Sequence, residues 1–197
     1  MNNNPDLRVI KTKKVIKLVF LNQLQTIGYN KISVSSITKE ALINRGTFYL
    51  HYKNKEDLLN SLQMDFINNL IKHININPLN MTHMTLNKEL EHLLLSFYQY
   101  CEANKQEIIT LFYSQDNSIF YNLLKTTMNK IFTNISKLNH IAEELTIPAH
   151  YLITMIASIH SGITEEWLLN NRDNSAEEIA TLVYTMIKSI PQSIFSN

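Results

Sequence analysis

The chain has 197 residues, of which only three are glycine and four are proline, too few turn-forming residues for an all-β protein or for an enzyme with a glycine-rich phosphate-binding loop. Its apolar content of 45% is enough for a packed core, and the scarcity of helix breakers favours a mostly helical fold. The formal net charge of +1 is unevenly distributed, because residues 1–55 hold ten basic and two acidic side chains, whereas residues 56–197 hold eight basic and fifteen acidic ones. A basic segment joined to an acidic remainder is typical of a module that binds a polyanion, although a solvated lysine-rich helix face would look similar.

The N-terminal part of the chain shows three helix signals in succession. Apolar residues at helical spacing predict an amphipathic helix over residues 8–27, and Gly28 supplies its stop. Ser33 is expected to cap a short second helix. Asn44 is expected to cap a third helix over residues 45–51, whose aromatic residues face inward.

The remainder of the chain is also predicted to be helical. Asn54 is expected to cap a fourth helix that ends near residue 73, and a loop follows at residues 74–84. Five further helices are expected near residues 85–103, 105–114, 116–138, 149–171 and 175–190. The predicted fold is therefore all-α with about nine helices, divided into a three-helix N-terminal domain, residues 1–54, and a helical C-terminal domain, residues 55–197.

The second and third helices, joined by a tight turn over the longer first helix, indicate a helix-turn-helix, whose last helix reaches base edges in the major groove of DNA. Arg45 can donate two hydrogen bonds to a guanine edge, and Thr47 can bind a phosphate or touch a thymine methyl group. Lys55 supplies a point charge for a phosphate, and the hydroxyl groups at the start of the second helix suit another. The predicted DNA-contacting residues are Ser33, Ser35, Ser36, Asn44, Arg45, Thr47, Tyr49, His51 and Lys55.

Residues 12–62 resemble the DNA-binding domain of the TetR/AcrR family of repressors. The resemblance is carried by the motifs Gly28-Tyr29, Ser33-Val34, Gly46-Thr47-Phe48-Tyr49 and Lys55-Glu56-Asp57-Leu58. It implies that DNA is contacted by the residues at matching positions, which are Ser35, Arg45, Thr47, Tyr49, His51 and Lys55. It implies packing roles for Val34, Ile37, Phe48 and Tyr52.

Two residues depart from the pattern of that family. Leu42 stands where the family often has glycine, which eases the turn between the two short helices. Asn44 stands where the family often has serine, and asparagine keeps the capping ability of serine. The departure at Leu42 therefore bears on the geometry of the turn, whereas the departure at Asn44 leaves the helix start intact.

The C-terminal part resembles, more weakly, the C-terminal region of regulators found alongside stress, transport and small-metabolite operons; residues 100–105 and 160–168 carry this resemblance. It implies a small-molecule pocket within the helices that follow the DNA-binding domain, whose occupancy moves the fourth helix and changes the spacing of two DNA-binding domains. The candidate pocket residues are Phe66, Phe97, Tyr98, Cys101, Phe112, Tyr113, Phe120, Met128, Met155 and His160. Each of the aromatic residues taken singly is more often a core residue than a ligand contact.

The last two predicted helices carry apolar stripes that indicate a dimer interface. A pair of such helices from each subunit would form a four-helix interface, although part of each stripe must also pack on its own chain. The candidate interface residues are Ile156, Ile159, Ile163, Trp167, Ile179, Leu182, Val183, Met186 and Ile190.

Metal and redox sensing have weaker sequence support. His140 and Glu143 are three residues apart, with His150 and His160 further on, but there is no HExxH or cysteine-rich spacing, so no metal and no cofactor is predicted. The single cysteine, Cys101, lies in an apolar-aromatic run and is expected to be a buried apolar residue, with redox sensing as the alternative.

The predicted function is a ligand-responsive, sequence-specific transcriptional regulator: a homodimeric repressor that a small-molecule effector releases from an inverted-repeat operator in double-stranded DNA. No nucleophile elbow, P-loop or dinucleotide fingerprint occurs, so an enzyme is not expected. The alternatives are a coregulator of the same fold whose C-terminal domain binds a partner protein, and a metal-responsive repressor. With no apolar run long enough for a membrane span, no secretion signal and one cysteine, the expected location is the cytoplasm.

Overall fold

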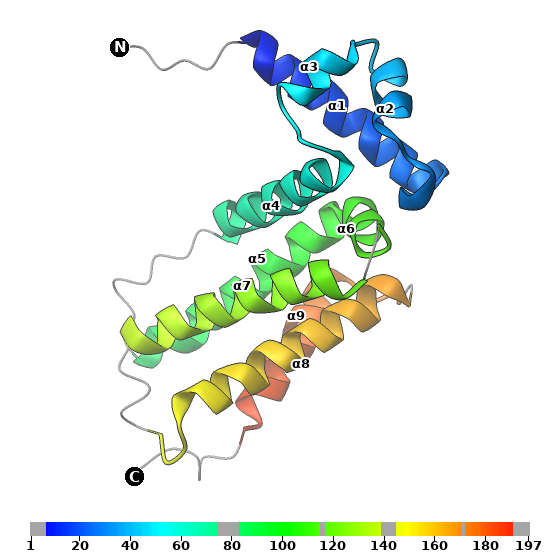
Figure 1. Ribbon diagram of the computed structural model, residues 1–197. Coiled ribbons are helices and arrows are strands. Elements are labelled where there is room, and N and C mark those ends of the chain that lie inside the picture. Colours follow the sequence, from blue (N-terminus) through cyan, green and yellow to red (C-terminus); the bar gives the residue numbers. More distant parts are fainter. Residues whose placement is uncertain (1–6, 75–82, 115–116, 139–144, 171, 191–197) are drawn as a thin grey trace. The chain divides into compact units, whose positions relative to one another are not determined.

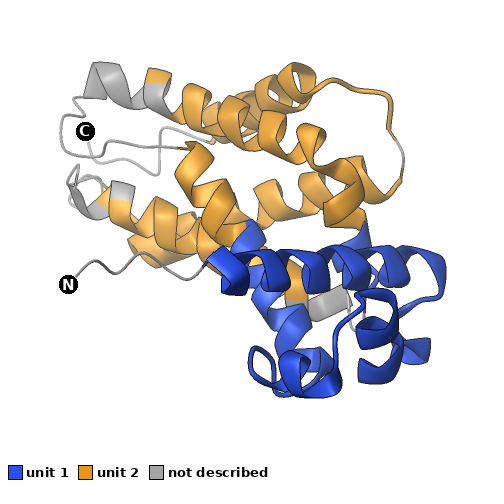
Figure 2. Ribbon diagram, turned by 90° about the horizontal axis from the view of Figure 1, so that it is seen from above, with its two compact units in different colours: residues 1–66, 110–117 blue, residues 67–109, 118–197 orange. Residues whose placement is uncertain are grey.

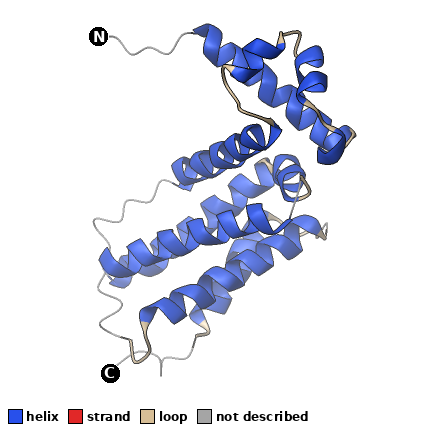
Figure 3. Ribbon diagram, viewed as in Figure 1, coloured by secondary structure: helices blue, strands red, loops and turns tan. Residues whose placement is uncertain are grey.

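The computed structural model describes residues 7–74, 83–114, 117–138, 145–170 and 172–190. The regular elements of these ranges are helices, with no strand among them (Figure 3). In chain order they are α1 (Leu7–Thr26), the 3-10 turn η1 (Tyr29–Lys31), α2 (Val34–Glu40), α3 (Arg45–Tyr49), α4 (Lys55–Ile74), α5 (His83–Ala103), α6 (Lys105–Phe112), α7 (Asn117–Leu138), α8 (Ala149–Leu169) and α9 (Ala176–Lys188) (Figure 1). The all-α prediction is confirmed for the described residues, and the expected helix ends lie within a few residues of the observed ones.

The chain divides into two compact units (Figure 2). The head unit comprises residues 1–66 and 110–117, and the body unit comprises residues 67–109 and 118–197. The boundary expected from sequence lies before residue 55, at the start of α4, whereas the two units divide within α4, between residues 66 and 67. The first turns of α4, up to Phe66, belong to the head unit, and their side chains Leu58 and Leu62 are buried.

Side-chain caps fix where the helices of the head unit begin. The Ser33 hydroxyl accepts a hydrogen bond from the Ser36 amide at 3.0 Å, and the Ser36 hydroxyl accepts one from the Ser33 amide at 3.1 Å, which together form a capping box. The Asn44 side-chain oxygen accepts from the Thr47 amide at 2.7 Å, and the Asn54 side-chain oxygen accepts from the Asp57 amide at 2.8 Å. The three predicted caps are confirmed.

Tertiary polar contacts hold α1 against the rest of the head unit. The buried Gln23 side chain of α1 donates to the Glu40 carboxylate at 2.6 Å and accepts from the Ser36 hydroxyl at 2.9 Å, which ties both ends of α2 to α1. Lys17 forms an ion pair with Asp65, which ties α1 to α4. The core beneath these contacts is apolar and includes the fully buried Ile16, Phe20, Ile37, Phe48 and Leu58.

The turn between α2 and α3 passes through Leu42 in the left-handed region of backbone space, with φ at 54°. A side chain with a Cβ is disfavoured there, whereas glycine is not. The Leu42 side chain is 91% exposed and so has almost no packing to compensate for this cost. The glycine that the family often has at this position therefore has a direct conformational reason.

Replacing Leu42 by glycine is expected to raise the free energy of unfolding by up to about 1 kcal/mol, because relief of the backbone strain exceeds the entropy that glycine adds to the unfolded chain. Urea denaturation followed by circular dichroism measures this change. Leu50→Gly is the matched control, because Leu50 is 81% exposed but has right-handed backbone angles of −66° and −21°. Leu50→Gly should destabilise the protein; equal losses in both variants would contradict the strain at Leu42.

The body unit is built on α5, α8 and α9, with α9 packed along α5 and along α8. A capping box starts α9, because Ser175 and Glu178 each accept the other's amide hydrogen, at 3.2 and 3.0 Å. The Trp167 indole N–H at the end of α8 donates to the Asn174 carbonyl at 2.9 Å and so fixes the turn into α9. None of the described helices is both long enough and apolar enough to cross a membrane.

Candidate nucleic-acid interface

Helix α3 has one inward residue and several outward ones. Phe48 has no exposed surface, and its ring lies 5.8 Å from that of Tyr52 and 5.6 Å from that of Tyr49, measured between centroids. Arg45 and Tyr49 are exposed. Phe48 thus anchors this five-residue helix to the core, and the side chains at the N-terminus of the helix remain exposed. A helix that reads base edges requires such exposed side chains.

Several of the predicted DNA-contacting residues also hold the local structure. The Ser33 and Ser36 hydroxyls form the capping box of α2, and the Asn44 side-chain oxygen accepts from both the amide and the hydroxyl of Thr47, the latter at 3.0 Å. Ser35 is exposed at the start of the same helix. The capping roles could be predicted from sequence. The hydrogen bonds show that some of the same side chains that are predicted to contact DNA also cap the helices.

Lys55 has partners within its own chain. Its ammonium group donates to the carbonyl oxygens of Tyr29 and Ile32, at 3.0 and 3.1 Å, and lies 4.2 Å from the centroid of the Tyr29 ring. These contacts join the N-terminus of α4 to the connection between α1 and α2. The structure adds a local role for the charge of Lys55, which no sequence motif signals, and the phosphate contact of Lys55 stays a prediction.

Replacing Lys55 by methionine, which keeps the aliphatic stem, is expected to lower the free energy of unfolding by about 1–3 kcal/mol because two part-buried carbonyl groups lose a charged donor. Urea denaturation measures the loss. Lys53→Met is the control, because Lys53 is exposed two residues earlier. If both variants kept the stability of the original protein and only Lys55→Met weakened DNA binding, Lys55 would be a phosphate contact alone.

The candidate pocket residues are distributed over both units. Phe97, Tyr98 and His160 lie together in the body unit, with ring centroids 4.3 to 5.3 Å apart. The other body-unit candidates that are buried are Cys101, Phe120 and Met128. Phe66 and Phe112 are buried residues of the head unit. Tyr113 and Met155 are 58% and 38% exposed.

Two residues beside His160 were absent from the predicted pocket. Thr164 lies one helical turn after His160 and donates to the His160 carbonyl at 2.7 Å. Phe132, from α7, lies 6.4 Å from the imidazole centroid. Spacing of four residues on one helix could have indicated Thr164, but nothing in the sequence relates Phe132 to His160.

The candidate dimer residues separate into buried and accessible sets. Trp167, Ile179 and Val183 are buried within this chain, so their part of the apolar stripes packs on the chain itself. Leu182 and Met186 are exposed on α9. The remaining candidates, Ile156, Ile159, Ile163 and Ile190, are half-buried.

Cys101 and the histidines have surroundings that bear on redox and metal sensing. Cys101 is buried, and burial raises the pKa of its thiol, which fits a buried apolar residue. Within the described ranges no three His, Cys, Asp or Glu side chains form a group that could hold a metal ion. His140 and Glu143 lie outside the described residues.

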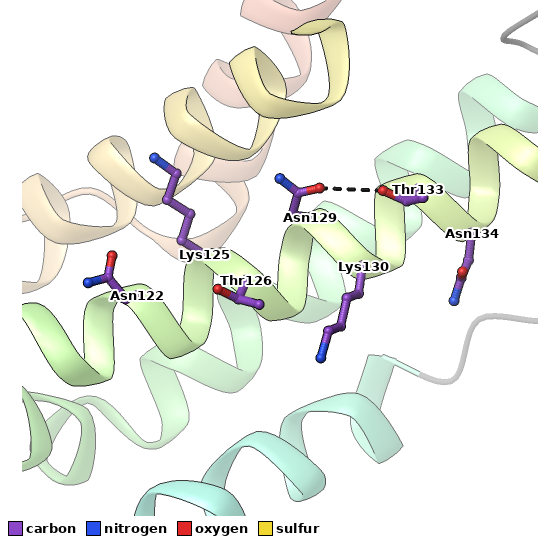
Figure 4. A pocket seen from close by; sticks show the side chains of 7 residues that line it. All are labelled: Asn122, Lys125, Thr126, Asn129, Lys130, Thr133 and Asn134. Carbon is purple, nitrogen blue, oxygen red and sulfur yellow. Dashed lines mark hydrogen bonds between the residues drawn. The ribbon is translucent and has the colours of Figure 1, made fainter. Parts of the chain in front are cut away.

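A polar hollow of about 580 Å³ runs along α7 (Figure 4). Its lining residues are Asn122, Lys125, Thr126, Asn129, Lys130, Thr133 and Asn134. Thr133 donates to the side-chain oxygen of Asn129 at 3.4 Å. None of the candidate pocket residues is among those that line it.

Comparison with known proteins identifies both parts of the chain. Residues 21–62 match the model for bacterial regulatory proteins of the tetR family, and residues 88–189 match the model for a transcriptional regulator C-terminal region of the same family. The second match covers more than half of the chain. The members of this family are transcriptional regulators and not enzymes.

The chain is similar to two curated regulators over part of their length. It is 38% identical over 72 residues to the HTH-type transcriptional regulator YxbF of Bacillus subtilis, a match that covers 36% of this chain and 19% of YxbF. It is 40% identical over 68 residues to the dhaKLM operon transcriptional activator DhaS of Lactococcus lactis, covering 34% of this chain and 35% of DhaS. The matches therefore span about a fifth and about a third of those two proteins.

Among solved structures, the TetR transcriptional regulator from Streptococcus agalactiae is 26% identical, with a TM-score of 0.67 over 92% of this chain and 96% of that one. A solved structure of a dihydroxyacetone kinase operon activator DhaS has a TM-score of 0.65 at 21% identity, over 95% of this chain and 99% of that one, and so shares the fold. From its helix-turn-helix, its helical body and these matches, we conclude that the chain belongs to the TetR family of transcriptional regulators.

Proposed function

We propose that the chain is a homodimeric regulator that binds an inverted-repeat operator through α3 and is released from it when a small molecule binds the body unit. The main observation in support of sequence-specific DNA binding is that Arg45 and Tyr49 are exposed on a helix that the buried Phe48 anchors. The basic residues of the first 55 positions support contact with phosphates. The proposed base contacts come from Arg45, Thr47, Tyr49 and His51, and the proposed phosphate contacts from the serines at the start of α2.

The proposed dimer interface lies on α8 and α9, which pack on each other and leave apolar side chains exposed. Met155 on α8 is partly exposed, as are Leu182 and Met186 on α9. Gly162 adds a position on α8 where a Cβ would meet no heavy atom within 4 Å, apart from its chain neighbours and the adjacent backbone of the same helix. A second copy that covered these side chains would bring two α3 helices onto one duplex, as an inverted repeat requires.

Replacing Gly162 by lysine is expected to shift the monomer–dimer equilibrium toward monomer by at least about tenfold, because a charge would be placed in an apolar interface. The same change should not disturb the single chain, since the position opens into free space and lysine is the better helix former. Sedimentation equilibrium measures the shift. Asn122→Lys adds the same charge to the polar hollow of α7 and should leave the equilibrium unchanged. Equal dimerisation of both variants would contradict the proposed interface.

The direction of regulation is proposed to be repression. The relative DhaS is named as an operon activator, which makes activation the second candidate. In vitro transcription distinguishes them, with a site selected from random duplex DNA placed over a promoter. Repression predicts fewer transcripts when the protein is added. An increased transcript level, with the site placed upstream of the promoter in a second template, would favour the activator. An unchanged level with both templates would contradict repression.

A further inference from the structure

A histidine and a tyrosine form a buried polar pair in the body unit. His160 of α8 is 1% exposed, and Tyr98 of α5 has no exposed surface. The Tyr98 hydroxyl oxygen lies 3.0 Å from the His160 Nδ1. The imidazole is also close to the Phe97 ring, at 4.3 Å between centroids, and lies among three aromatic rings when Phe132 is included. The imidazole of this pair is therefore in contact with aromatic rings on several sides.

The hydrogen bonds around this pair favour one of the two neutral forms of the imidazole. The Thr164 hydroxyl lies 2.7 Å from the His160 carbonyl oxygen and 3.4 Å from the Tyr98 hydroxyl, so its single proton goes to the carbonyl. Of the two acceptors near the Tyr98 hydroxyl, the His160 Nδ1 at 3.0 Å is closer than the Thr164 oxygen at 3.4 Å, which favours donation of the Tyr98 proton to Nδ1. Burial raises the pKa of Tyr98 and lowers the pKa of His160 to about 3, so the tyrosine is protonated and the imidazole is neutral. A neutral imidazole that accepts at Nδ1 carries its hydrogen on Nε2.

The His160 Nε2–H has no hydrogen-bond partner among the described residues. The Ser161 and Thr164 hydroxyls of the same helix donate to the carbonyls of Ala157 and His160, at 2.7 Å each, and neither accepts a hydrogen bond from Nε2. Buried donors without an acceptor are rare in native proteins and destabilise the state that contains them. A molecule that placed an acceptor beside Nε2 would form the missing hydrogen bond, and this hydrogen bond would contribute to its affinity.

We propose that the Nε2–H of His160 is the hydrogen-bond donor of the effector site, and that its ligand is an uncharged aromatic molecule of about one ring with a single hydrogen-bond acceptor. The aromatic neighbours Phe97 and Phe132 supply ring faces and edges for such a molecule. No Asp, Glu, Lys or Arg occurs among the buried side chains of the described residues, so a charged ligand would have no counter-ion there. This inference rests on the effector response proposed above.

Insertion beside the imidazole has a structural consequence. Phe132 comes from α7 and His160 from α8, and their ring centroids are 6.4 Å apart. This distance is that of two rings in direct contact, so a ligand ring between them would have to move α7 away from α8. A ligand thus satisfies the buried donor and changes helix packing in the same step, which is what an effector must do to favour one conformation.

Two compounds of almost the same shape test the donor directly: acetophenone, which has a carbonyl acceptor, and α-methylstyrene, in which a methylene group replaces that oxygen. Binding is measured by NMR titration of the full chain without DNA. Acetophenone is expected to bind about tenfold more tightly, the ratio that about 1.4 kcal/mol produces. In His160→Phe, which keeps a ring but removes the N–H, the ratio should fall to about one. Equal binding of the two compounds, a ratio retained in the variant, or binding of neither would overturn the proposal.

A second measurement needs no substitution. In the original protein with ¹⁵N-labelled histidine, the His160 signals should show a hydrogen on Nε2, and the Nε2 shift should change with acetophenone but not with α-methylstyrene. A hydrogen on Nδ1 instead, or an Nε2 shift that neither compound changes, would overturn the proposal and leave His160 as a core residue whose N–H faces a ring. Since no DNA is present, either failure is distinct from a failure of operator binding.

Discussion

Arg45→Ala is expected to weaken binding to the selected operator by about 5- to 150-fold, equivalent to about 1–3 kcal/mol, and to relax the base preference at one position in each half-site. The physical reason is that a guanidinium can donate two hydrogen bonds to a guanine edge, and Arg45 is exposed at the first position of α3. Titration of labelled duplexes that differ at single positions measures both effects.

Two further variants separate base reading from charge. Arg45→Lys keeps the positive charge without the planar fork, so it should retain binding to random DNA but lose the base preference. Arg172→Ala removes the same charge from an exposed site of the body unit, where Arg172 is paired with Glu166, and should leave the operator affinity almost unchanged. Equal losses for Arg45→Ala and Arg172→Ala would contradict a base contact by Arg45.

Phe48→Ala is expected to lower the free energy of unfolding of the head unit by about 3–5 kcal/mol, because it empties a position with no exposed surface. The loss should remove DNA binding by releasing α3 from Tyr52 and the rest of the core. Hydrogen exchange of the head-unit amides measures the local stability. Phe48→Leu keeps most of the volume and should lose only about 1 kcal/mol. If Phe48→Ala abolished DNA binding at unchanged stability, Phe48 would act on DNA itself and not as an anchor.

The local features of the fold could be predicted from sequence because their causes are local. Ser33 and Asn44 cap helices through amides three residues away, and the apolar spacing of α1 requires only a helix and a core. The aromatic at position 48 belongs to a motif whose inward orientation the structure confirms. The strained backbone of Leu42 was also indicated, since the family pattern has glycine there.

Contacts between distant residues could not be predicted. Lys55 binds carbonyl groups 26 and 23 residues earlier in the chain, and a carbonyl group has no sequence signature. An apolar stripe shows that a helix face is covered but not what covers it, so Trp167 and Val183 looked like interface residues although their own chain buries them. The Tyr98–His160 pair joins residues 62 positions apart, and only the structure shows that one imidazole nitrogen has a partner and the other has none.

The central claim, that the chain reads DNA as a dimer through α3, is tested most directly by selecting binding sites from random duplex DNA. The original protein and an Arg45→Ala/Tyr49→Ala variant are compared at the same moderate salt concentration. We predict that the original protein enriches an inverted repeat and that the variant does not. Enrichment of the same repeat by the variant, or no enrichment by the original protein, would contradict base reading by α3.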